Sequence, residues 1–124
     1  MTGHALLVLM VERNPAVIDL ARHFLERYGF RTAFAEDGLA ALSMAVELRP
    51  DVLITEILVP RMDGLAVCRQ LKAHELTRAI KVVVFSVLHA RERALAAGAD
   101  AFLLKPVQED RLLETVQQLL AIDG

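Results

Sequence analysis

The sequence predicts a doubly wound α/β fold, in which helices cover both faces of a five-stranded parallel sheet. Short apolar runs alternate five times with segments whose apolar residues recur at helical spacing, and the connections are short. Repeated strand–helix units of this kind form parallel sheets joined by right-handed crossovers. The composition agrees, because 55% of the 124 residues are hydrophobic and only 5% are aromatic, which suits strands buried on both faces. The length suits one domain over residues 1–124.

The first strand–helix unit has clear boundaries. Residues Ala5–Val11 form a continuous apolar run, which predicts a buried strand. Asn14 and Pro15 then provide an N-cap and a first-turn proline. Gly29 is placed to close this helix just beyond its C-cap. The apolar face of the helix is expected to comprise Val17, Leu20, Ala21, Phe24, Leu25 and Tyr28.

The second unit begins with a strand of different character. Apolar and polar residues alternate over Phe30–Phe34, which indicates a more exposed strand near the edge of the sheet. Asp37-Gly38 begins a helix over Leu39–Leu48, and Pro50 ends it.

The last three units complete the sheet. We expect a third strand over Val52–Ile57, a loop containing Pro60 and Gly64, and a helix from Leu65 to about His74. The remaining elements are a strand over Val82–Phe85, a short helix over Ala90–Ala97 capped by Gly98, a strand over Ala101–Leu104 and an amphipathic helix over Asp110–Ala121. Five parallel strands favour the flavodoxin-like arrangement, because a closed barrel would need more such units.

Composition excludes several classes of function. The formal net charge is −2 and there is no basic run, so this domain itself is not expected to bind nucleic acid. No apolar run approaches the length of a membrane span and the N-terminus lacks a signal-peptide pattern, so we expect a cytoplasmic protein. The single Cys68 excludes an internal disulfide and should pack as a small hydrophobe. The four His residues are scattered, so a metal site built on them is not expected.

Polar residues follow four of the predicted strands. In a parallel sheet the carboxyl ends of the strands meet at one edge, where ligands and chemistry are found. A carboxylate, a hydroxyl and an ammonium around one crevice can hold a small anion or a cation. The residues expected there are Glu12 and Arg13 after the first strand, Glu56 after the third, Ser86 after the fourth, and Lys105-Pro106 after the fifth.

These residues lie within motifs that resemble the receiver domain of two-component response regulators. The resemblance runs from Leu6 to Ala121. Val11-Glu12-Arg13-Asn14-Pro15 is similar to the family's Val-Glu-Asp-Asn-Pro, and Asp51–Gly64 resembles its phospho-acceptor strand followed by Pro-x-Met-Asp-Gly. Ser86 falls at the family's hydroxyl position, Phe102 at its aromatic switch position, and Leu104-Lys105-Pro106 at its Lys-Pro motif.

The resemblance implies a phosphoryl-transfer site with two departures. In such receivers an Asp takes a phosphoryl group from a histidine kinase, two acidic residues hold Mg²⁺, and the Lys and hydroxyl bind the phosphate, so that cations neutralise the charge on the oxygens. Here Glu56 stands at the acceptor position and Arg13 at the second acidic position. Glu12 and Glu56 then face Arg13 and Lys105, which gives a formal charge of zero. We therefore expect weak or no Mg²⁺ binding, with Glu12 the only weak candidate ligand.

The main hypothesis is a degenerate receiver, not an enzyme, that does not need phosphorylation. Glu56 is one methylene longer than Asp, so its carboxylate reaches toward the phosphoryl space and can pair with Lys105 or contact Arg13 in a bidentate manner. It would imitate the phosphorylated state in charge and position only. Two alternatives stay open: a phosphorylatable receiver that uses Thr55 or Ser86, and a small flavodoxin-fold ligand binder. Strand alternation turns Thr55 away from the site, and no Gly-rich phosphate loop supports the second alternative.

The predicted partner surface is also unusual. Ser86 and Lys105 are 19 positions apart, roughly three fewer than the family pattern implies, so the fourth helix or its leading loop should be short. Phe102 is either an outward switch aromatic or a packing residue. Val87 and the two residues after it form either an exposed apolar contact site, which we favour, or a cover over the crevice. The expected partner is a histidine kinase, a downstream signalling protein or a second copy of the chain. Whether an effector domain follows Gly124 is left open.

Overall fold

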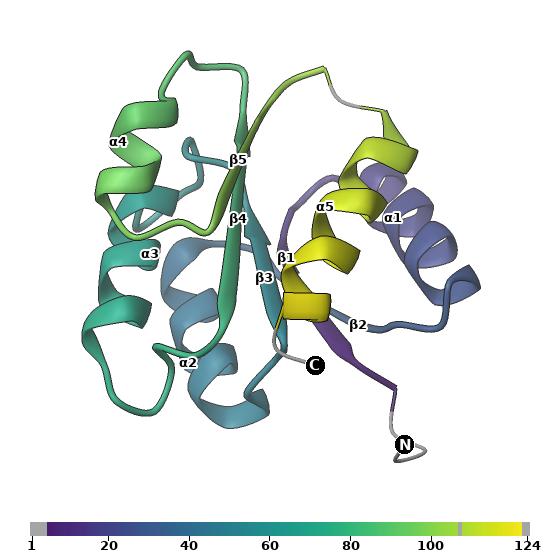
Figure 1. Ribbon diagram of the computed structural model, residues 1–124, viewed down its shortest axis with the longest axis horizontal. Coiled ribbons are helices and arrows are strands. Elements are labelled where there is room, and N and C mark those ends of the chain that lie inside the picture. The colour runs from purple at the N-terminus through teal and green to yellow at the C-terminus, as the bar shows by residue number, and fades with distance from the viewer. Residues whose placement is uncertain (1–4, 107, 123–124) are drawn as a thin grey trace.

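The computed structural model describes residues 5–106 and 108–122 as a three-layer α/β structure (Figure 1). Its strands are β1 (Leu7–Val11), β2 (Arg31–Ala35), β3 (Val52–Thr55), β4 (Lys81–Ser86) and β5 (Ala101–Leu104). Its helices are α1 (Pro15–Arg27), α2 (Gly38–Leu48), α3 (Gly64–Ala73), α4 (Arg91–Ala96) and α5 (Glu109–Ile122). The strands are parallel and lie in the order β2-β1-β3-β4-β5. This confirms the predicted doubly wound, flavodoxin-like fold.

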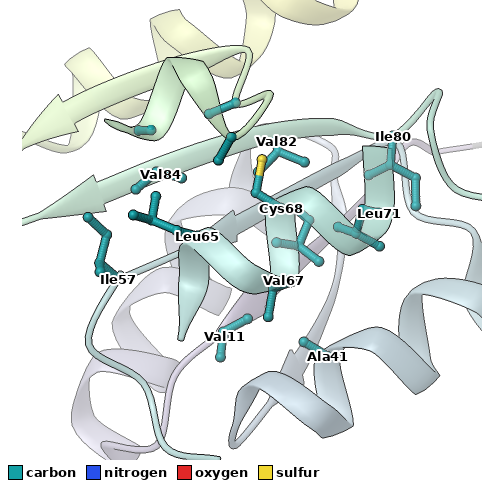
Figure 2. Packing of buried hydrophobic residues seen from close by; sticks show 14 of the residues in the cluster. Val11, Ala41, Ile57, Leu65, Val67, Cys68, Leu71, Ile80, Val82 and Val84 are labelled. Atoms are coloured by element: carbon teal, nitrogen blue, oxygen red, sulfur yellow. The ribbon is translucent and has the colours of Figure 1, made fainter. Parts of the chain in front are cut away.

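The two faces of the sheet are covered by different helices. In Figure 1, α1 and α5 lie against one face, and α2, α3 and α4 against the other. Alternation along the strands divides the buried side chains accordingly, so that Val8 and Met10 belong to one cluster and Leu9 and Val11 to the other. Figure 2 shows the cluster on the α2–α4 side, where Val67 and other apolar residues of α3 pack against the sheet.

The ends of most elements are set by local side-chain chemistry that the sequence indicates. The carboxyl and amide oxygens of Asn14, Asp37 and Asp63 accept backbone N–H groups at the starts of α1, α2 and α3. Gly29 follows the C-cap of α1 with φ of +93°, a backbone conformation that glycine adopts without strain. β2 is an edge strand, as its alternating pattern predicts.

The structure corrects one boundary that matters for the site. The apolar pattern predicts a third strand that continues to Ile57, but β3 ends at Thr55. The side chain of Glu56 folds back and accepts the N–H groups of Ile57 and Leu58, so these groups are not available for strand pairing. The chain then turns toward α3, and the Gly64 N–H donates to the Ile57 carbonyl at 2.9 Å.

Helix α4 is only six residues long, in keeping with the short segment between Ser86 and Lys105. Its N-cap is Ala90, which offers no side-chain hydrogen bond. None of the helices within residues 5–106 and 108–122 is both long and apolar enough to cross a membrane.

Candidate functional site

The carboxyl ends of β3, β4 and β5 bring three of the predicted site residues into contact. Glu56 directly follows β3, Ser86 is the last residue of β4, and Lys105 directly follows β5. The strands are neighbours in the sheet, with Thr55 paired to Val84 and Ser86 paired to Leu104. Parallel pairing therefore places the three polar groups side by side, as the topology predicts.

The carboxylate of Glu56 is the centre of this cluster. Its Oε1 lies 3.0 Å from the Lys105 Nζ. Its Oε2 accepts the hydroxyl hydrogen of Ser86, the Ile57 N–H at 2.7 Å and the Leu58 N–H at 3.3 Å. The Glu56 side chain is only 15% exposed and that of Lys105 30%. Both carboxylate oxygens are thus engaged by donors from this chain.

These contacts determine the protonation state of Glu56. Burial by itself would raise the pKa of this carboxyl group. Hydrogen bonds from Ser86, Lys105, Leu58 and Ile57 act in the opposite direction and outweigh burial, so the pKa lies below its usual value of 4.5. Glu56 is therefore ionised at neutral pH.

Lys105 is held on two sides. Its backbone N–H donates to the Ser86 carbonyl at 2.8 Å, and its ammonium lies 4.5 Å from the centroid of the Phe85 ring. A cation over an aromatic face is stabilised by the ring quadrupole, which limits the positions of the ammonium beside Glu56. The peptide bond to Pro106 is cis, and Pro106 itself is exposed. Phe85 was not among the predicted site residues, because it reads as part of an apolar strand.

Glu12 and Arg13 lie beside the cluster and do not contact it. The Oε2 of Glu12 accepts the N–H groups of Arg13 and Asn14, both at 3.1 Å. The Arg13 side chain is exposed, and within the described part of the chain it makes no ion pair with Glu56. Of the two pairings that the sequence allows for Glu56, the structure has the one with Lys105.

A hollow of about 230 Å³ adjoins the cluster. Charged side chains of both signs line it, together with apolar residues of the loop after β3. This volume is below the roughly 300–1,000 Å³ of typical pockets for drug-sized ligands and cofactors. The charged residues around it are Glu12, Arg13, Glu36, Glu56 and Lys105. Among the described residues, no group of three or more His, Cys, Asp or Glu side chains is placed to hold a metal ion.

The backbone beneath Glu56 requires glycine at position 64. A Cβ atom built on Gly64 would lie 2.2 Å from the Glu56 carbonyl oxygen, far inside contact distance. The first turn of α3 can therefore approach the end of β3 only because this position lacks a side chain. This close approach fixes the start of α3 directly against the backbone of the cluster.

Thr55, the other candidate hydroxyl, is inaccessible. It is fully buried, and its Oγ1 donates to the Glu56 carbonyl oxygen at 2.9 Å. Ser86 is also fully buried, and its hydroxyl is already donated to Glu56. Neither hydroxyl is free in this structure to act as a nucleophile.

The residues predicted for the partner surface separate into buried and exposed positions. Phe102 is 4% exposed and packs in the α2–α4 cluster, with the Arg91 guanidinium carbon 5.5 Å from its ring centroid. Val87 is 58% exposed. Leu88 packs against the same cluster, and its N–H donates to the Ser86 Oγ at 3.2 Å. Leu88 thus does not lie over the hollow beside Glu56, because the residues lining that hollow do not include it.

Comparison with known proteins identifies the family. Residues 8–117 match the family model of the response regulator receiver domain. The chain is 34% identical over 116 residues to the polar-differentiation response regulator DivK of Brucella anthropi, covering 91% of this chain and 94% of DivK. It is 32% identical to the DNA-binding dual master transcriptional regulator RpaA of Synechocystis, covering 91% of this chain but only 48% of RpaA. The chain thus spans about half the length of RpaA.

A solved structure supports the same family assignment. The signal receiver domain of a signal transduction histidine kinase from Syntrophus aciditrophicus superposes with a TM-score of 0.87 at 35% identity, covering 94% of this chain and 91% of that one. The residues gathered at the carboxyl ends of β3, β4 and β5 therefore lie at one edge of the sheet in a receiver fold. The chain belongs to the response regulator receiver domain family of two-component signalling.

Proposed function

We propose that this receiver domain signals through protein contacts without being phosphorylated. Glu56 occupies the position at which receivers carry the acceptor Asp, and Arg13 the position of one metal-binding acid. In this proposal Glu56 permanently supplies the negative charge that phosphorylation would add. The module is not an enzyme, and it acts in the cytoplasm on a histidine kinase or a downstream signalling protein.

The observation that supports this proposal is that both oxygens of the Glu56 carboxylate already have partners within this chain. An acceptor oxygen must be free to attack a phosphoryl donor in line. Here Oε1 pairs with Lys105, and Oε2 accepts Ser86 and two backbone N–H groups. In the family, the Lys and the hydroxyl bind the new phosphate. In this chain both already bind a carboxylate.

The charges around the hollow beside Glu56 are also unfavourable for binding Mg²⁺. Around the same hollow Glu12, Glu36 and Glu56 contribute three negative charges, and Arg13 and Lys105 contribute two positive charges, so the formal charge there is only −1. Mg²⁺ requires near-ideal octahedral oxygen geometry and gives up its water reluctantly. The Glu12 carboxylate already accepts two backbone N–H groups, and the adjacent guanidinium repels a second cation. We therefore propose weak or absent Mg²⁺ binding.

The test is labelling by a small phosphodonor followed by intact mass spectrometry. The wild-type chain is incubated with acetyl phosphate and Mg²⁺, and we expect no gain of a phosphoryl group. The Arg13→Asp, Glu56→Asp double variant restores both family positions and should gain one, in a Mg²⁺-dependent manner. Robust labelling of the wild-type chain would contradict the proposal.

A second measurement locates any residual binding. Amide spectra of the wild-type chain are recorded with Mg²⁺ and then with beryllofluoride, a mimic of the phosphoryl group. We expect no shifts at Glu56, Ser86, Phe102 or Lys105. Shifts at these residues would mean that the site still binds metal and anion, and would favour a phosphate-regulated module. Peptide mapping of any labelled chain separates labelling at Glu56 from labelling at Thr55 or Ser86.

A further inference from the structure

The structure contains a groove between α3 and α4 that the family assignment does not explain. Its volume is about 540 Å³. Leu65, Leu88 and Ala97 form its apolar floor, and Leu58 contributes an exposed apolar wall. Arg69 of α3 and Arg93 of α4 stand at its rim. We refer to these six residues as the α3–α4 groove.

The wall of this groove is unusually apolar for a surface. Leu58 is 64% exposed, the highest exposure among the large hydrophobic side chains described. Val87, 58% exposed, precedes Leu88 of the floor in the chain and is not itself a lining residue. Exposed apolar side chains gathered around a concavity are typical of protein contact sites, whereas single scattered ones are not.

The charges of the groove indicate what it binds. Within the described residues, the guanidinium groups of Arg69 and Arg93 have no hydrogen bond or ion pair with another side chain. The single lining carboxylate, Asp63, accepts the Ala66 N–H at 2.9 Å as the N-cap of α3. The two arginines come from different helices and flank an apolar floor. This arrangement is complementary to an apolar side chain with carboxylates on either side.

Hydrogen bonds connect the α3–α4 groove to the Glu56 cluster. The Glu56 Oε2 accepts the N–H of Leu58, which holds one wall. The same oxygen accepts the Ser86 hydroxyl, and the Ser86 Oγ accepts the N–H of Leu88, which holds the floor. One carboxylate oxygen therefore positions both sides of the groove, although Glu56 does not line it.

We propose that the α3–α4 groove docks an acidic–apolar segment of a partner protein, a segment that places a Leu, Ile, Phe or Met side chain beside Asp or Glu residues. The proposal rests on the proposed function, because it names the chemistry of the partner through which the module would act. The partner's apolar side chain enters between α3 and α4, and its carboxylates pair with Arg69 and Arg93.

The test is selection of random twelve-residue peptides displayed on phage against the whole immobilised chain. We expect enrichment of Asp or Glu next to large apolar residues. The best peptide is then synthesised and its affinity measured by fluorescence anisotropy. The Arg69→Glu, Arg93→Glu variant should bind it at least about tenfold more weakly, because reversal turns attraction into repulsion. Binding should also weaken as salt increases.

A matched control separates local contacts from net charge. Arg27 and Arg78 are also exposed and lie outside the groove, so Arg27→Glu, Arg78→Glu changes the net charge equally. This control should bind within about twofold of the wild type. Circular dichroism and urea unfolding check that both variants fold. Glu56→Ala should weaken binding by a factor of about three or more, because it releases Leu58 and Leu88 and removes pre-organisation.

Three outcomes would overturn the docking proposal: no enrichment, enrichment of neutral or basic peptides, or unchanged binding by the groove variant. A selected peptide that matches a segment of this chain would indicate self-association instead. The selection uses no phosphodonor, so it is independent of the labelling test. A chain that is labelled yet still selects acidic peptides contradicts the proposed function alone, and an unlabelled chain that selects none contradicts the groove alone.

Discussion

Removing the carboxylate of Glu56 should destabilise the fold measurably. In Glu56→Ala, the Lys105 ammonium loses its partner at 3.0 Å, and the Ser86 hydroxyl and two backbone N–H groups lose their acceptor. Exposed ion pairs contribute at most about 1 kcal/mol, while deleting one partner of a fully buried pair costs about 3–5 kcal/mol. Glu56 and Lys105 are 15% and 30% exposed, and the adjoining hollow admits water, so the cost lies between these limits. We expect a loss of about 2–3 kcal/mol.

The assay is urea unfolding followed by circular dichroism. For a slope of about 2 kcal/mol/M, the midpoint should fall by about 1 M or more. The matched control is Glu36→Ala, because Glu36 is an exposed carboxylate that lines the same hollow but makes no hydrogen bond or ion pair among the described residues. Its effect should stay within about 0.5 kcal/mol. A loss below 1 kcal/mol for Glu56→Ala, or equal losses for both variants, would refute the assignment of Glu56 as the centre of the cluster.

The remaining predictions concern the pH dependence of stability, the ion pair of Glu56 with Lys105, the backbone contact at Gly64 and the reactivity of Cys68. The lowered pKa of Glu56 means that its stabilising contribution is present above the unfolded value near 4.5 and is lost as the pH falls through the lower folded value. The unfolding free energy of the wild type should thus fall more steeply with acidification than that of Glu56→Gln, and parallel profiles would contradict this. Lys105→Met removes one of the lowering contacts, so the Glu56 pKa, followed by carbon-13 NMR of its carboxyl group, should rise; an unchanged pKa would show that the ion pair has no effect. Gly64→Ala places a Cβ 2.2 Å from the Glu56 carbonyl oxygen and should cost about 2 kcal/mol or more in urea unfolding, whereas a neutral effect would mean that α3 shifts freely. Burial raises the pKa of the Cys68 thiol to about 11, so iodoacetamide at neutral pH should modify it only after urea unfolding, and rapid modification of the folded chain would show that α3 opens.

Periodicity and cap chemistry were enough to predict the fold. Apolar runs marked β1, β3, β4 and β5, because parallel strands covered on both faces consist mainly of apolar residues, and an alternating pattern marked the edge strand β2. Cap residues such as Asn14 and Asp37 located the helix starts, because their side chains satisfy backbone N–H groups that the first turn leaves free. The main boundary error was the end of β3. The backbone N–H groups of Ile57 and Leu58 bond to a side chain, and apolarity alone cannot reveal that competition.

The sequence was enough to predict which three residues form the cluster, but not which cation pairs with Glu56. Topology alone places the ends of β3, β4 and β5 together, so Glu56, Ser86 and Lys105 could be grouped from the sequence. Which cation would pair with Glu56 depends on where each side chain emerges. Lys105 leaves β5 beside Phe85 and Ser86, whereas Arg13 follows Glu12 into the exposed start of α1. The α3–α4 groove was not predicted, because it combines residues from four separate segments, namely α3, α4 and the loops after β3 and β4.

The contacts of the Glu56 carboxylate have a consequence for regulation. Under the proposed function no phosphoryl group is added at the end of β3, and the lowered pKa of Glu56 keeps its carboxylate ionised near neutral pH. The hydrogen bonds that link Glu56 through Ser86 to Leu88 would then not be switched by phosphate, and neither would the shape of the α3–α4 groove. Under the proposed function, occupancy of the groove depends only on the concentration and affinity of the partner. Regulation would then act on the partner, through its abundance or through a modification that changes the charge of its acidic segment.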